Sequence, residues 1–189
     1  MKRVTSLTPV FVLIATVAFA QGGAPPQGQK LGLAQSLQNG YNNIKRNLTE
    51  MAAKMDEANY NFQPTRDVRT YGQLFGHVAN AQFGTCAALK GEANPNQGTD
   101  NEKKATKAEL VKALNDSFTY CDAAFAALTD ANVTESIKQG MNEVTRAAAA
   151  ANLIAHSNEM YGTGAVYMRL KGLVPPSTER AAAARRPGN

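Results

Sequence analysis

Two histidines, His77 and His156, are the residues of this chain best suited to chemistry, and the sequence contains no others. His77 lies in the helical pattern Q-L-F-G-H-V-A-N-A, and His156 lies in A-H-S-N-E-M-Y-G, on a long predicted helix that a glycine and then two prolines close at Pro175-Pro176. Imidazole is the side chain that proteins use most often to bind metals. If the two helices face each other inside a bundle, the two rings would form part of a metal site.

Two further candidate ligands follow His156 on the same helix face, because residues three and four positions apart are neighbours on a helix. Glu159 would complete a set of two imidazoles and one carboxylate, whereas the thioether of Met160 would favour a soft ion such as Cu(I). The plainer alternatives are two histidines hydrogen-bonded within the bundle, a solvated Glu159 and a Met160 that fills the core.

Four long helices are predicted to position these residues, because apolar side chains recur every three or four positions along most of the chain. Capping boxes at Thr70-x-x-Gln73 and Thr106-x-x-Glu109 mark two helix starts. No alternating segment of strand length is evident. We therefore expect an all-α four-helix bundle, with helices over residues 30–58, 70–89, 106–128 and 142–170 and a connector over residues 129–140.

The first twenty residues have the pattern of a signal peptide: a basic start, an apolar stretch from Leu7 and a small-x-small end at Ala20. The apolar stretch is shorter than the ~20 residues of a membrane-spanning helix, although a retained anchor is the alternative. We expect a signal peptide over residues 1–20, a flexible leader over 21–29, the bundle over 30–178 and a disordered basic tail over 179–189. This organisation predicts a periplasmic or secreted protein without membrane contact after cleavage.

The two cysteines, Cys86 and Cys121, fall in separate predicted helices. Export would expose them to an oxidising compartment, where pairing is favoured. We expect a disulfide that joins the two helices, with two buried free thiols as the alternative. Neither cysteine belongs to a C-x-x-C pair, which argues against a catalytic thiol.

The charge of the chain argues against nucleic acid as a partner. The formal net charge is +5, but residues 28–178 carry 15 Lys and Arg against 14 Asp and Glu, a net charge of 15 − 14 = +1. Such a balance produces no strong positive field. The sequence also lacks a Gly-rich phosphate loop, a G-x-S-x-G elbow and an H-E-x-x-H motif, so the corresponding enzyme classes are not indicated.

The combination of L-F-G-H-V-A with A-H-S-N-E-M-Y-G and V-Y-M-R-L-K-G-L-V-P-P-S resembles the DinB-like superfamily of bacterial four-helix-bundle proteins. The resemblance covers the chain from about Leu31 to Ser177. It implies a divalent metal such as Zn, Ni or Mn, bound by one histidine on the second helix and an H-x-x-x-H pair on the last. His77 and His156 match two of these positions, and Met160 stands where the pattern has the third histidine.

Three hypotheses follow for function. The first is an exported DinB-like bundle with a partial two-histidine metal site, which as an enzyme would perform metal-assisted hydrolysis or group transfer. The second is a metal-free binding or structural bundle, whose pocket for an unidentified small molecule or whose homodimer surface is the functional part. The third is a carrier of a soft metal or of haem, with His77 and either Met51 or Met55 as the axial haem ligands.

Overall fold

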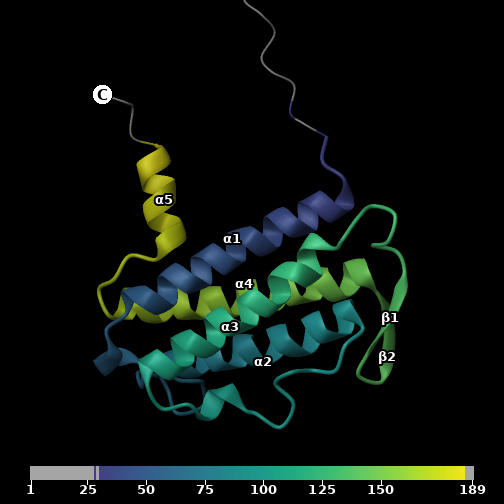
Figure 1. Cartoon of the computed structure of the whole chain (residues 1–189). Coiled ribbons are helices and arrows are strands. Elements are labelled where there is room, and N and C mark those ends of the chain that lie inside the picture. The colour runs from purple at the N-terminus through teal and green to yellow at the C-terminus, as the bar shows by residue number, and fades with distance from the viewer. Residues whose placement is uncertain (1–27, 29, 186–189) are drawn as a thin grey trace, which may run out of the picture. The chain divides into compact units, whose positions relative to one another are not determined.

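Four long helices dominate the computed structural model, which describes residue 28 and residues 30–185 (Figure 1). They are α1 (Leu33–Lys54), α2 (Tyr71–Lys90), α3 (Lys107–Ala126) and α4 (Arg146–Leu170). Their positions confirm the four predicted helices, with shorter ends. The predicted signal peptide and almost all of the leader lie outside the described residues. Among the helices that the structure describes, none is both long and apolar enough to cross a membrane.

The packing of the helices brings α2 and α4 side by side. Each of these two helices also has a second neighbour, since α2 packs against α3 and α4 packs against α1, while α1 and α3 close the ring. Large side chains from all four helices fill the centre and are almost completely buried; they include Leu48, Phe75, Phe118 and Met168. Because α2 and α4 are neighbours, their two histidines can meet.

Both predicted capping boxes are present. The Thr70 hydroxyl accepts a hydrogen bond from the backbone N–H of Gln73 at 3.2 Å, and the Gln73 side chain accepts from the backbone N–H of Thr70 at 2.9 Å. Thr106 and Glu109 make the same reciprocal pair at the start of α3. These bonds satisfy backbone donors that have no partner within the helix, so the start of α2 and the position of His77 along it are well defined.

A short hairpin precedes α4, so the prediction of a chain without strands was wrong. Strands β1 (Ser136–Gln139) and β2 (Asn142–Thr145) pair antiparallel, with Ile137 opposite Val144. Gly140 has a φ of 63° at the first turn position, as a two-residue type II′ turn requires. The hairpin occupies the region where the sequence predicted a connector and the start of the last helix, and α4 instead begins after its N-cap Thr145.

The predicted disordered tail is helical as far as Ala184, since α5 covers Pro176–Ala184. Its side chains dock on α1, where Glu179 pairs with Lys54 and Arg180 pairs with Glu50. A proline at the first helical position favours this start. Residues 186–189 lie outside the described residues.

The predicted disulfide is present between Cys86 on α2 and Cys121 on α3. Both cysteines are fully buried, and their Cα atoms are 5.3 Å apart. The bond therefore fastens together two neighbouring helices of the bundle.

Candidate functional site

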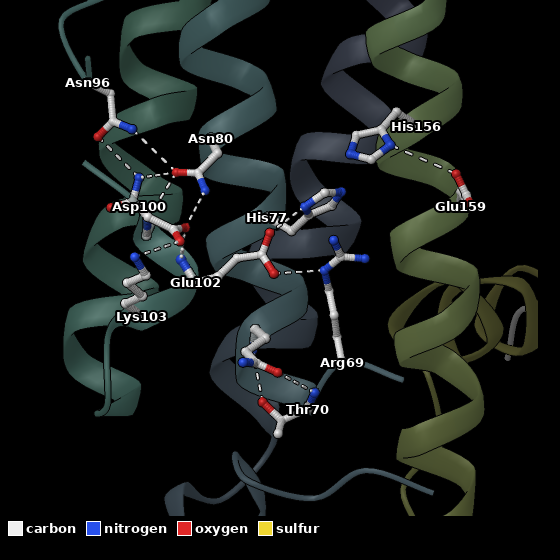
Figure 2. A network of polar contacts seen from close by, with 12 residues as sticks. Arg69, Thr70, His77, Asn80, Asn96, Asp100, Glu102, Lys103, His156 and Glu159 are labelled. Atoms are coloured by element: carbon white, nitrogen blue, oxygen red, sulfur yellow. Dashed lines mark hydrogen bonds and ion pairs between the residues drawn. The ribbon is translucent and has the colours of Figure 1, made fainter. Parts of the chain in front are cut away.

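The two histidines meet between α2 and α4, as the sequence predicted. The ring centres of His77 and His156 are 4.8 Å apart and the ring planes are inclined by 65° (Figure 2). The two side chains are 26% and 27% exposed. They therefore lie at the edge of the bundle core and are partly exposed to solvent.

His77 is held by a carboxylate that the sequence analysis did not identify. Its Nδ1 lies 2.6 Å from Oε1 of Glu102, which belongs to the short 3-10 helix η2 (Asn101–Lys103) in the loop before α3. The other Glu102 oxygen accepts from Nε of Arg69 at 2.8 Å. An ionised carboxylate only accepts hydrogen bonds, so Nδ1 of His77 carries a proton, and Nε2 is the nitrogen that holds the lone pair in the neutral form of the ring.

His156 has one buried nitrogen without a partner. Among the described residues, no hydrogen-bonding group reaches its Nε2, and Oε2 of Glu159 lies 3.8 Å from its Nδ1. Burial, together with the neighbouring His77, lowers the pKa of His156 below its ordinary value. The ring is therefore neutral near pH 7 and offers an unprotonated nitrogen.

Glu159 and Met160, the other two predicted ligands, both line a cleft of about 550 Å³ beside the imidazole pair. Glu159 is largely exposed, with 71% of its side chain accessible, whereas Met160 is buried. The contact that Glu159 makes with His156 is to Nδ1 and not to the unpartnered Nε2. Their exact roles as ligands stay a prediction.

The cleft has charges of both signs on its walls. The segment before α2 contributes Arg66, Asp67 and Arg69, and Glu102 and Glu159 add two carboxylates from η2 and α4. Apolar and hydroxyl side chains complete the lining: Val68, Leu74, Met160, Thr163 and Tyr167. Such a surface is suited to a small polar molecule that carries both charges or hydrogen-bonding groups.

Sequence reasoning missed Glu102 and Arg69, because Glu102 comes from the loop between α2 and α3 and Arg69 reaches the site through its contact with Glu102. Glu102 lies 25 residues after His77, in a stretch without apolar periodicity. A weak signal was present in Asp100, which caps η2 by accepting from the backbone N–H of Glu102. That signal predicts a turn but does not indicate which helix the turn contacts.

The family is decided by a sequence comparison. A model of the DinB superfamily matches residues 42–163, which include both histidines and most of the four long helices. The chain belongs to the DinB superfamily. No curated protein matches it.

Solved structures share the DinB fold at low sequence identity. A DinB-like protein from Bacillus cereus has a TM-score of 0.64 at 15% identity, with 75% of this chain and 95% of that chain covered. A conserved protein from Enterococcus faecalis has a TM-score of 0.61 at 16% identity, with 75% and 98% covered. A DinB-like protein from Bacillus subtilis has a TM-score of 0.59 at 19% identity, with 72% and 92% covered. The similarity establishes the fold.

The spacing of the two rings is compatible with two imidazoles on one divalent ion. A zinc ion about 2.0–2.1 Å from each ring nitrogen lies roughly 3.2 Å from each ring centre, so two rings on one tetrahedral ion are about 5 Å apart. The observed separation of 4.8 Å agrees with this value. Within the described part of the chain the buried Nε2 of His156 has no hydrogen-bonding partner, and a carboxylate like the one on Nδ1 of His77 is the usual outer partner of a metal-binding histidine.

The set of donors is nevertheless incomplete for a tight site. No group of three His, Cys, Asp or Glu side chains with metal-binding geometry occurs within residues 30–185. Met160 stands where the DinB-like pattern led us to expect the third histidine. The haem alternative finds less support, because Met51 and Met55 are fully buried in the core and Met51 packs closely under Gly164.

Proposed function

We propose that this DinB protein is exported and binds a divalent metal ion weakly between His77 and His156, beside a cleft that takes a small polar molecule. The observation that carries the proposal is the buried, unpartnered Nε2 of His156 next to a His77 whose other nitrogen is held by Glu102. A neutral imidazole that lacks a hydrogen-bonding partner is costly to bury, and a metal ion would supply that partner.

A bound ion at this position would activate water or a thiol for hydrolysis or group transfer. The protein's own residues would prepare the site. Glu102 keeps the proton of His77 on Nδ1, and burial keeps His156 neutral. Arg69, anchored by Glu102, and Arg66 would attract an anionic group of the small molecule to the cleft.

Metal binding to the protein purified without a histidine tag tests the proposal. Calorimetric titration with Zn²⁺, Ni²⁺ and Mn²⁺ should give one ion per chain, and His77→Ala and His156→Ala should each abolish binding. Asn158→Ala is a matched control on α4, since its side chain only donates to the carbonyl of Ile154. No binding and no thermal shift with any of the three ions would refute the metal site.

Further variants identify the third ligand. If Glu159 is a ligand, Glu159→Gln should weaken Zn²⁺ binding, and if Met160 is a ligand, Met160→Leu should weaken Cu⁺ binding selectively. Met160→His restores the third histidine of the family pattern. A third imidazole should raise the affinity for Zn²⁺ by at least tenfold, because thioethers are poor ligands for borderline metals.

A metal-free binding bundle is the second candidate, and the incomplete donor set favours it. Here the cleft alone would be functional, with His156 as a neutral hydrogen-bonding group at its edge. Binding of a small molecule by the wild type and by His77→Ala with equal affinity would support this candidate. A homodimer is a further proposal, which sedimentation of the purified protein tests directly.

A further inference from the structure

The loop between α2 and α3 holds Glu102 against His77 without any metal ion. Residues 94–102, which we call the clasp, lie in the loop between α2 and α3 and include the start of η2, from which Glu102 projects. Figure 2 shows the polar side chains of the clasp meeting around Asn80, which lies three residues after His77 on α2.

Asn80 makes four hydrogen bonds to the clasp. Its Oδ1 accepts from the backbone N–H of Asn101 at 3.0 Å, from Nδ2 of Asn101 at 2.9 Å and from Nδ2 of Asn96 at 3.3 Å. Its Nδ2 donates to Oδ1 of Asp100 at 3.0 Å, and the same oxygen accepts from the backbone N–H of Glu102 at 3.1 Å. One amide therefore fixes the backbone on both sides of Asn101.

Gly76 lets the clasp lie directly on α2. A Cβ atom at this position would be 2.5 Å from the carbonyl oxygen of Asn101 and 2.7 Å from the backbone nitrogen of Glu102. These are backbone atoms, so a side chain could be accommodated only by moving η2 away. Asn101 itself is 2% exposed, and its side-chain amide is hydrogen-bonded to Asn80 and Asn96.

We propose that Asn80 is a positioning residue of the imidazole pair. By fixing the clasp against α2 through hydrogen bonds, Asn80 holds the Glu102 carboxylate on Nδ1 of His77. The proton of the neutral ring then stays on Nδ1, and Nε2 keeps the lone pair that can bind a metal ion or accept a hydrogen bond. Asn80 lies on the same helix as His77, so the clasp and the imidazole share one rigid support. The inference concerns the orientation and tautomer of His77 in the metal-free protein, so its failure is distinguishable from a failure to bind metal.

Long-range proton–nitrogen NMR spectra of the ¹⁵N-labelled, metal-free protein test this role. The chain contains only two imidazoles, and His156→Gln assigns them. At pH 8.5, well above the ordinary histidine pKa of about 6.5, wild-type His77 should carry its proton on Nδ1. Asn80→Ala should shift the tautomer ratio toward Nε2–H by about tenfold, because a charge-assisted hydrogen bond is lost.

Asn132→Ala is the matched control. Its side chain also fixes a loop, by accepting from the backbone N–H of Thr129 and donating to the carbonyl of Ala127, but it lies in the connector before β1. It should leave the tautomer of His77 unchanged. An altered His77 tautomer in this variant would show that the effect reflects general loosening and would overturn the assignment to Asn80.

A double variant separates action through Glu102 from other effects. Glu102→Ala should change the tautomer at least as much as Asn80→Ala, and Asn80→Ala should add nothing in the Glu102→Ala background. If Asn80→Ala does not fold, Asn80→Asp is the second variant. It keeps the acceptor but replaces the donor to Asp100 by a like charge at the same position, so a shift of the tautomer ratio in the same direction is expected. Wild-type His77 protonated on Nε2, an unchanged ratio in the Asn80 variants, or an additive double variant would each overturn the proposal.

Discussion

Reduction of the Cys86–Cys121 disulfide is expected to destabilise the bundle strongly. The bond joins α2 to α3 across a sequence separation of 35 residues, and both sulfur atoms are buried. In the chain-entropy expression, 1.5R ln 35 plus the constant of 2.1 gives about 12.7 cal/mol/K, or about 3.8 kcal/mol at 25 °C. Since domains of this size are usually stable by only about 5–15 kcal/mol, the reduced protein should unfold at a much lower urea concentration.

The assay compares urea unfolding curves of the same protein before and after reduction in the unfolded state and refolding with reductant present. The reduced protein keeps both sulfur atoms in the core, so no side-chain volume is removed. A Cys86→Ala, Cys121→Ala double variant is the control, and reductant should not change its curve. A reduced protein within about 1 kcal/mol of the oxidised one, or two titratable thiols in the unreduced unfolded chain, would refute the reasoning.

Three further outcomes are expected. Gly164→Ala should lower the free energy of unfolding by about 1–3 kcal/mol in thermal unfolding, because its Cβ would lie 2.6 Å from Sδ of Met51. Gly162→Ala is the control, since its Cβ would meet no atom of the described residues within 4 Å, and it should be neutral or gain up to about 1 kcal/mol. Thr106→Ala removes the capping box of α3 and should cost about 1 kcal/mol in urea unfolding. Burial lowers the pKa of His156 in the folded chain, so the unfolded chain binds one more proton at acidic pH. The free energy of unfolding should therefore fall as the pH drops below about 6.5. Urea unfolding curves measured from pH 5 to 8 should show a smaller pH dependence of this free energy in His156→Gln.

The hypothesis that His77 and His156 meet rested on their placement in two predicted helices of one bundle and on the resemblance to the DinB-like pattern. It required these two helices to be neighbours, and α2 and α4 are neighbours in this bundle. The Cys86–Cys121 bond was predicted on other grounds, because the two cysteines fall in separate helices and export would expose them to an oxidising compartment. The starts of α2 and α3 were predictable because their capping boxes consist of hydrogen bonds between residues only three positions apart.

The hairpin and α5 depend on tertiary contacts that no local pattern reveals. Each strand is four residues long and contributes one apolar residue, Ile137 or Val144, to the core cluster. Four residues are too few for a period of two to stand out. Helix α5 is rich in alanine and carries one Glu and one Arg, and the ion pairs that these two residues make with α1 become visible only in the folded chain.

Glu102 was beyond sequence reasoning for a different physical reason. Its contact with His77 arises because the clasp folds back along α2. The clasp can pack against the helix there because Gly76 has no side chain. A glycine within a helix usually predicts weakness or close packing, and the sequence does not identify the segment that packs there. A loop without periodicity thus contributes the carboxylate that orients the site.

The same carboxylate connects the two parts of the site. Glu102 touches His77 through one oxygen and Arg69 through the other, and Arg69 lines the cleft. An anionic molecule in the cleft would compete with Glu102 for the guanidinium of Arg69. If Arg69 no longer bound Glu102, the hydrogen bond between Glu102 and His77 would become stronger, because a carboxylate that also binds a cation is a weaker acceptor for a second donor. Occupancy of the cleft would therefore be coupled to the contact between Glu102 and His77 through this one side chain.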